Sequence, residues 1–291
     1  MFDKIKAQFI FEALLKRPDI MKAYKMVGPE DSWYDTITTV HNSLAEIQKL
    51  PHEDWEISSH DGLSLKGKFY PGTTNKTMIW IHGYTSHAER ESAFPGLFYH
   101  GMGYNVLIPY LRAHGPSEGK YISFGPLEKL DIKRWIDKVN KRVPGGILIH
   151  GLSMGGGIAL DLATMELENV KCILADAPSH SIPEFFSGVA RYNSKKHPEK
   201  LVEALYQRFR KEFSADAVNY DRCENIRNGK YPLMVTAGSN EGMEQILSVI
   251  KERNPQPTTT LILPGCNHGN GMYKQTQMYQ NAIREFAEQY M

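Results

Sequence analysis

The chain has 291 residues, a formal net charge of +1, a hydrophobic share of 41% and a charged share of 23%. This composition excludes a largely disordered chain, and the near-neutral charge excludes the strongly basic surface that binds nucleic acid or anionic membranes. Three cysteines, Cys172, Cys223 and Cys266, form no CxxC pair. They argue against a disulfide framework or a thiolate zinc site and favour a reducing compartment.

The first 52 residues predict helices. Phe9, Ile10, Ala13 and Leu14 recur at helical spacing, which is typical of an amphipathic helix. Charged residues interrupt this stretch, so it resembles neither a signal peptide nor a membrane-spanning segment. We therefore expect a cytoplasmic protein in which residues 1–52 form a helical extension packed on the body.

Eight short apolar runs predict β-strands in the rest of the chain. The first two runs are joined across Asp61-Gly62, a dipeptide typical of hairpin turns, so we expect this pair to be antiparallel. From residue 76 onward the apolar runs alternate with helical patterns, which is typical of a parallel sheet covered on both faces. We expect an α/β fold over residues 53–291, with an eight-stranded, mostly parallel, doubly wound sheet. The predicted strands span residues 55–60, 63–70, 77–81, 104–108, 146–149, 172–175, 233–236 and 259–263.

A long connection separates the sixth and seventh predicted strands and predicts a helical cap over about residues 180–230. Within it, apolar side chains recur at every fourth position: Leu201, Leu205, Phe209 and Phe213. Such a stripe most often packs into a core, but here one face is expected to overhang the carboxyl ends of the strands, where ligands of open α/β sheets bind. Three further aromatic residues complete the predicted apolar substrate pocket: Phe185, Phe186 and Tyr192.

The sequence Gly151-Leu-Ser153-Met-Gly155 matches the G-x-S-x-G pattern and lies between an apolar strand and a helical segment. This is the context of a nucleophile elbow, in which a strand reverses sharply into a helix and exposes a serine hydroxyl. Small residues on either side let the neighbouring backbone approach closely, and the helix N-terminus adds a positive dipole near the developing oxyanion. Ser153 is therefore the predicted nucleophile.

An oxyanion hole needs two backbone N–H donors near that serine. One comes from the residue after the nucleophile, Met154. The other comes from the loop after the first parallel strand, where the sequence reads His82-Gly83-Tyr84, and the matching position is Tyr84.

The serine also needs a general base, and the best-placed histidine is His268. It lies in the loop after the last predicted strand and before the final helix, downstream of the nucleophile. No other histidine has this position.

These features together resemble a serine hydrolase of the α/β-hydrolase superfamily over roughly residues 53–291. The segment from Tyr110 to Gly119 resembles the family's D-x-R-G-H-G-x-S-x-G loop, and Asp131 and Trp135 fit the helix that follows in the bacterial cytoplasmic esterase and peptidase-like branch. The chain departs from that loop at two positions that are not catalytic, with Tyr110 in place of Asp and Ala113 in place of Gly.

The same resemblance implies the acid of the triad. Residues 232–241 match the family's P-x-L-V-x-A-G-S-x-D segment without gaps, which places Glu241 at the Asp position. Asp176, at the end of the sixth predicted strand, is the alternative acid, because some members supply it from there. Its other expected role is to cap a helix or bond the backbone.

The predicted function is hydrolysis of a carboxylic ester of a small molecule through an acyl-enzyme, without a cofactor. An oligopeptidase or amidase and a thioesterase or acyltransferase use the same triad and stay open. A non-catalytic binding module on this fold would usually have lost a triad residue, and a dehalogenase would carry a carboxylate in place of Ser153. No metal-ligand motif or dinucleotide fingerprint occurs, and we expect no nucleic-acid or membrane partner. The sequence leaves the oligomeric state open.

Overall fold

A computed structural model describes residues 2–18, 30–31, 33–194 and 196–291. One eight-stranded sheet forms its centre, in the order β1-β2-β4-β3-β5-β6-β7-β8. β2 runs antiparallel to both of its neighbours, β1 and β4, and the remaining pairs are parallel. The strands are β1 (Glu53–Ser58), β2 (Ser64–Tyr70), β3 (Thr77–Ile81), β4 (Asn105–Pro109), β5 (Ile147–Leu152), β6 (Val170–Asp176), β7 (Leu233–Gly238) and β8 (Thr258–Leu263). The predicted α/β sheet is confirmed.

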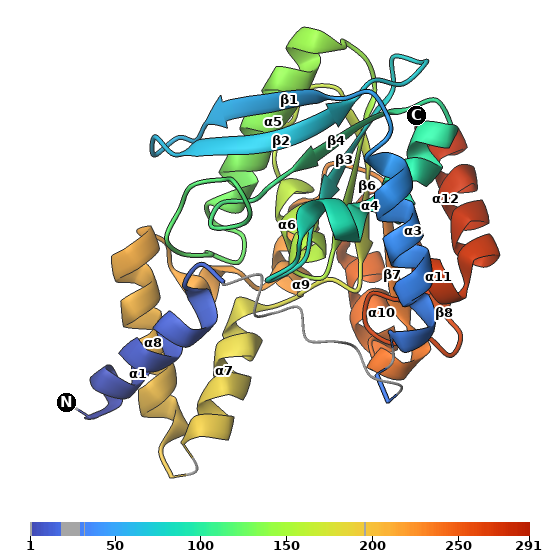
Figure 1. The fold of residues 1–291 in the computed structure, drawn as a ribbon. Helices are drawn as coiled ribbons and strands as arrows, with labels where there is room; N and C mark the ends of the chain where they lie inside the picture. Colours follow the sequence, from blue (N-terminus) through green and yellow to red (C-terminus); the bar gives the residue numbers. More distant parts are fainter. Residues whose placement is uncertain (1, 19–29, 32, 195) are drawn as a thin grey trace.

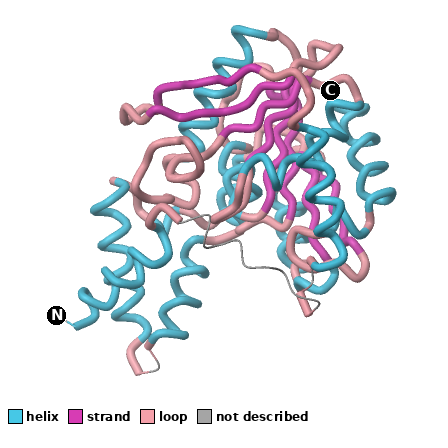
Figure 2. Tube along the Cα trace, in the orientation of Figure 1, coloured by secondary structure: helices cyan, strands magenta, loops and turns pink. Residues whose placement is uncertain are grey.

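Helices cover both faces of this sheet, as Figures 1 and 2 show. Successive residues of a strand point to opposite faces, so Ile79 joins one core and Trp80 the other. The first core is covered by α5 (Glu128–Arg142), α6 (Met154–Leu162) and α10 (Glu244–Arg253). The second is covered by α3 (Ile37–Ile47), α4 (Ala88–Gly101) and α12 (Thr276–Tyr290). Short helices α9 (Arg222–Asn225) and α11 (Gly271–Lys274) lie in the connections.

The connection between β6 and β7 carries two longer helices, α7 (Ile182–Asn193) and α8 (Pro198–Phe213). In Figure 1 they stand with α1 (Phe2–Leu15) as a lobe beside the sheet. The predicted apolar stripe of α8 is buried inside this lobe. The ring centroid of Phe209 lies 5.7 Å from that of Phe186 in α7, and the ring centroid of Phe213 lies 5.9 Å from that of Phe11 in α1. The stripe thus forms the core of the lobe.

The first helix is present where the sequence predicts it, but it buries a different face. Ala7, Phe11 and Leu15 are buried, whereas Phe9 is 72% exposed. Because α1 carries apolar residues around most of its circumference, its pattern does not define one face, and packing against α8 selects the Phe11 side. The N-terminal region is divided, since α1 lies on the lobe and α3 packs beside α4 on the body.

Within the described ranges, no helix combines the length and the apolar character needed to cross a bilayer. The three cysteines are buried and form no disulfide.

Candidate active site

Ser153 lies in the turn between the last residue of β5 and the first residue of α6. Its backbone has φ +58° and ψ −112°, a conformation that is strained for a residue with a side chain. The flanking glycines are sterically required: a β-carbon at Gly151 would lie 2.1 Å from the carbonyl oxygen of Gly155, and one at Gly155 would lie 1.9 Å from that of Ile81. The G-x-S-x-G pattern therefore forms the sharp elbow that the sequence predicts.

His268 lies in the loop after β8, and its Nε2 is 2.8 Å from the hydroxyl oxygen of Ser153. Its Nδ1 is 2.6 Å from Oε2 of Glu241. Since the carboxylate accepts a hydrogen bond from the Nδ1–H group, the neutral ring carries its proton on Nδ1, and Nε2 is left unprotonated and can accept the serine proton. The hydrogen bond that His268 donates to Glu241 also raises the pKa of His268, because it stabilises the imidazolium form.

Glu241 reaches His268 from a single 3₁₀ turn, η4 (Ser239–Glu241), that follows β7. Its second carboxylate oxygen accepts the backbone N–H of Gly238 at 2.7 Å, which fixes the side chain. The backbone N–H of Asn240 donates to the carbonyl of Cys266 at 3.0 Å and ties this turn to the histidine loop. These contacts let a glutamate, one methylene longer than aspartate, meet the ring.

Asp176, the alternative acid, is buried and directed elsewhere. Its carboxylate accepts the hydroxyl of Thr236 at 2.7 Å, and burial raises its pKa. Its backbone carbonyl accepts the N–H of Ser153 at 2.8 Å, so this residue supports the elbow. Among the hydrogen bonds of the described residues, His268 has Glu241 as its acid partner.

The loop after β3 is held by the side chain of His82. Its Nδ1 lies 2.8 Å from the carbonyl oxygen of Gly83, and its Nε2 accepts the N–H of Leu111 at 3.1 Å. Burial lowers the pKa of His82 well below its ordinary value, so the ring is neutral and donates from Nδ1. In a trans peptide the C=O and N–H point in opposite directions, so this bond also fixes the direction of the Tyr84 N–H.

The second predicted donor, Met154, is the first residue of α6. An amide at that position has no acceptor within its own helix and is free to bind an anion.

A cavity of about 330 Å³ opens beside Ser153 and His268. One wall is mainly apolar and is formed by Trp33, Val40, Leu152 and Tyr273. The lining also includes the polar or charged residues Thr85, Ser86, His87, Arg90 and Glu91. The ring centroids of Trp33 and Tyr273 are 5.5 Å apart in an edge-to-face contact.

The predicted substrate-binding residues of the cap do not line this cavity. Phe186 is buried in the lobe, and Tyr192 is 88% exposed on α7. The ring centroids of Phe185 and Phe124 are 5.0 Å apart, and those of Phe124 and Tyr84 are also 5.0 Å apart. Phe185 is thus separated by Phe124 from the loop after β3, which carries the predicted oxyanion donor Tyr84 and is called the oxyanion loop below. Most of these aromatic side chains lie outside the cavity because α7 and α8 pack against each other and against α1. Trp33 lines the cavity although no local motif in the sequence marks it.

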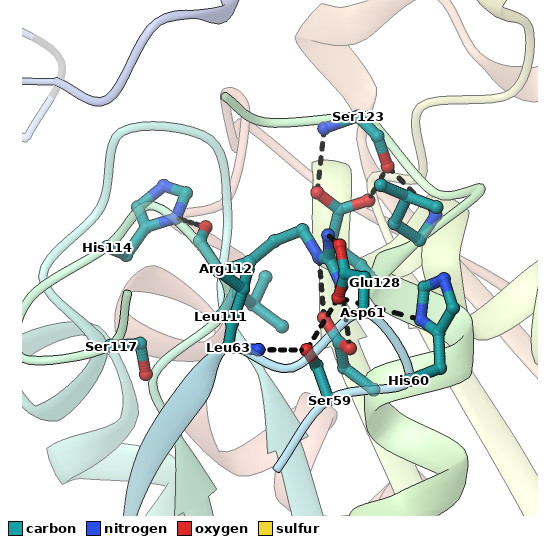
Figure 3. A network of polar contacts seen from close by, with 12 residues as sticks. Ser59, His60, Asp61, Leu63, Leu111, Arg112, His114, Ser117, Ser123 and Glu128 are labelled. Carbon is teal, nitrogen blue, oxygen red and sulfur yellow. Dashed lines mark hydrogen bonds and ion pairs between the residues drawn. The ribbon is translucent and has the colours of Figure 1, made fainter. Parts of the chain in front are cut away.

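The loop after β4 is anchored by a polar network, drawn in Figure 3. The guanidinium of Arg112 donates to Asp131 at 2.7 and 2.8 Å and to Asp61 at 3.0 Å. Ala113 has φ +60°, which explains why the related loop carries glycine there. His60, Asp61 and Asp131 are close enough together to hold a cation, but the Arg112 guanidinium already fills that role.

Comparison with known families agrees with this geometry. A family model, Hydrolase_4, described as "Serine aminopeptidase, S33", matches residues 72–267, more than half of the chain. The chain belongs to the serine aminopeptidase S33 family. The fold of this S33 protein is that of the α/β-hydrolase superfamily, as the sequence resemblance implied.

Several proteins are similar to this S33 family member. The uncharacterized Bacillus subtilis (strain 168) protein YqkD is 26% identical over 262 residues, which cover 85% of this chain and 83% of that protein. A multifunctional-autoprocessing repeats-in-toxin protein of Vibrio vulnificus is 29% identical over 166 residues, 54% of this chain and only 3% of the toxin. A solved esterase of Pyrococcus furiosus is 26% identical with a TM-score of 0.64, over 84% of this chain and 94% of that one.

Proposed function

We propose that this protein is a serine carboxylesterase that hydrolyses small esters through an acyl-enzyme. The observation that carries the proposal is the continuous hydrogen-bonded chain Glu241–His268–Ser153, whose last two residues line the cavity. A nucleophile hydrogen-bonded to a base that is itself oriented by a carboxylate is the arrangement that acyl transfer requires.

The reaction proceeds in two halves. Ser153 Oγ attacks the ester carbonyl carbon while His268 Nε2 takes its proton, and the N–H groups of Tyr84 and Met154 receive the oxyanion. The tetrahedral intermediate breaks its C–O bond, and His268 passes the proton to the departing alkoxide, which leaves as the alcohol. Water, deprotonated by His268, then attacks the acyl-enzyme, and the carboxylic acid leaves as the proton returns to Ser153.

The cavity favours a small acyl group. Its volume of about 330 Å³ lies at the lower end of ligand pockets, which span about 300–1,000 Å³. The wall of Trp33, Val40 and Leu152 provides an apolar surface for a short alkyl or aryl chain.

Turnover of p-nitrophenyl esters from acetyl to decanoyl tests the proposal. We expect hydrolysis with the highest kcat/KM for short chains. An absence of turnover along the whole series would contradict the function.

Hydrolysis of an amide is the second candidate, and the S33 family description favours it. A panel of aminoacyl p-nitroanilides, measured beside the esters, separates the two. Higher kcat/KM for the anilides than for every ester would replace the esterase proposal with an aminopeptidase.

A further inference from the structure

A second carboxylate, that of Glu91, lies at the candidate active site. Glu91 is in the first turns of α4 and lines the cavity beside Ser153. Its Oε1 accepts the indole N–H of Trp80 at 3.0 Å and the backbone N–H of Gly83 at 3.0 Å, and its Oε2 lies 3.1 Å from the same amide nitrogen. The mechanism proposed above gives this side chain no role.

Gly83 lies between the carboxylate and the nucleophile. A β-carbon at this position would be 3.1 Å from Oε2 of Glu91 and 3.5 Å from the β-carbon of Ser153. The backbone of Gly83 therefore packs against both side chains, and a shift of this residue changes the space next to the reacting carbonyl.

Both peptide groups that flank Gly83 are held by side chains. Glu91 binds the N–H of the first peptide, and His82 binds the C=O of the second. The second peptide also carries the N–H of Tyr84, the predicted oxyanion donor. With both planes fixed, that N–H is directed before substrate arrives, which is the preorganisation that lowers a barrier.

We propose that Glu91 is a positioning residue that clamps the oxyanion loop through Gly83 and so keeps the Tyr84 N–H aimed at the developing oxyanion. The inference rests on the proposed function and deepens it. Glu91 acts through Gly83 and does not itself touch the reacting atoms.

A carboxylate in a pocket can alternatively bind a cationic group of the substrate. A carboxylate has about four acceptor positions, and the donors already directed at Glu91 are Trp80, Gly83 and the Ser86 side chain. Because its acceptors serve groups of the protein, the loop-clamping role is favoured.

Burial raises the pKa of Glu91 to about 7, against the lowering effect of its hydrogen bonds. An ionised carboxylate accepts more strongly than a neutral one, so the clamp is strongest above this pH. Titratable and charged groups face Glu91 from several elements: Asp176 at the end of β6, His268 after β8, Tyr273 of α11, and His87 and Arg90 of its own segment.

The test compares Glu91→Gln with a matched control, Glu89→Gln. Gln keeps the shape of Glu91, and its one acceptor oxygen can take the place of Oε1. Its NH₂ group then replaces Oε2, which lies 3.1 Å from the amide nitrogen of Gly83, so a donor faces a donor and the hold on Gly83 is weakened. Misplacing a catalytic group by about 1 Å costs on the order of 100-fold, so we expect Glu91→Gln to lower kcat roughly 10- to 100-fold with KM nearly unchanged. Glu89 is a buried carboxylate on the same helix that bonds Tyr110, and its variant should keep kcat within about threefold.

Inhibition by a trifluoromethyl ketone, which forms a tetrahedral oxyanion on the serine, provides the decisive readout. We expect its inhibition constant to rise for Glu91→Gln in parallel with the loss of kcat, because both report the oxyanion donors. An unchanged inhibition constant and kcat would overturn the proposal. A raised KM confined to cationic esters would also overturn it and assign Glu91 to substrate recognition.

If Glu91→Gln fails to fold, Glu91→Asp takes its place, since the shorter carboxylate reaches Gly83 less well and should give the same parallel loss. Wild-type ester turnover tests the proposed function separately. If the wild type hydrolyses no ester, the rate of fluorophosphonate labelling of Ser153 replaces kcat, and an unchanged rate in Glu91→Gln overturns the clamp alone.

Discussion

Tyr84 donates its phenol hydroxyl to the backbone carbonyl of Leu14, which joins the oxyanion loop to the last turn of α1. The next residue, Leu15, accepts the N–H of Ile122 at 2.7 Å, so the end of this helix also binds the segment that precedes α5. The N-terminal helix therefore supports the back of the candidate active site while packing on the cap helix α8.

Removing the Tyr84 hydroxyl should loosen this support without removing the oxyanion donor, which is a backbone N–H. A single hydrogen bond contributes about 1 kcal/mol, so we expect Tyr84→Phe to lower the free energy of unfolding by about 0.5–1.5 kcal/mol and kcat by less than tenfold. Urea unfolding and ester turnover measure the two effects. Tyr192→Phe, at an exposed tyrosine, is the control. A loss of kcat above 100-fold would show that the hydroxyl takes part in the chemistry.

The acid of the triad is tested by amide substitutions at the two carboxylates. Glu241→Gln removes the anion that orients His268, and the expected loss of kcat is about 10⁴-fold with the fold intact. Asp176→Asn, whose side chain bonds Thr236, should cost at most about tenfold. Steady-state kinetics and circular dichroism of both variants decide the matter. Reversed losses would assign the acid to the end of β6.

The pH dependence of kcat/KM should report the ionisation of His268. The base acts when neutral, and its hydrogen bond to Glu241 raises its pKa above the ordinary 6.5. Activity should therefore rise with pH through a midpoint above 6.5, and Glu241→Gln should move this midpoint to lower pH as well as lowering the plateau. An unchanged midpoint in that variant would contradict the assignment of this rise in activity to the ionisation of His268.

Stability and substrate selectivity should respond to different aromatic residues. Phe209 is fully buried in the lobe, and truncating such a side chain to alanine costs about 3–5 kcal/mol, so Phe209→Ala should lower the melting temperature and leave chain-length preference unchanged. Trp33→Ala should change the chain-length preference more than the melting temperature, because it enlarges the cavity beside Ser153 and admits longer acyl chains. Thermal unfolding and the ester series distinguish the two variants. A chain-length preference that changes in Phe209→Ala but not in Trp33→Ala would show that the cap forms part of the substrate pocket.

The sheet and the strand-to-helix elbow that carries Ser153 could be predicted from the sequence because both are locally encoded. Apolar strands alternate with helices, and the elbow needs only small residues at fixed offsets around Ser153. His268 follows from its place after the last strand. The ungapped match to a family segment predicts Glu241 as the acid, and in the structure its carboxylate lies 2.6 Å from Nδ1 of His268.

The pocket could not be predicted because tertiary packing forms it. The stripe on α8 indicates that one face is buried, but it does not say against which partner, and the actual partners are α1 and α7. Trp33 meets Tyr273 from the other end of the chain, and no spacing in the sequence connects these two residues. Glu91 likewise acquires its place only when α4 packs beside Trp80.

The most direct test of the account is intact-protein mass spectrometry during turnover of a slowly deacylated aryl ester. We predict that the wild type gains the mass of one acyl group during the initial burst of alcohol release, and that peptide mapping locates this group on Ser153. Ser153→Ala should show no adduct, and its turnover should fall on the order of 10⁶-fold. Ester turnover by Ser153→Ala near the wild-type rate, or an acyl adduct on a different residue, would contradict the account.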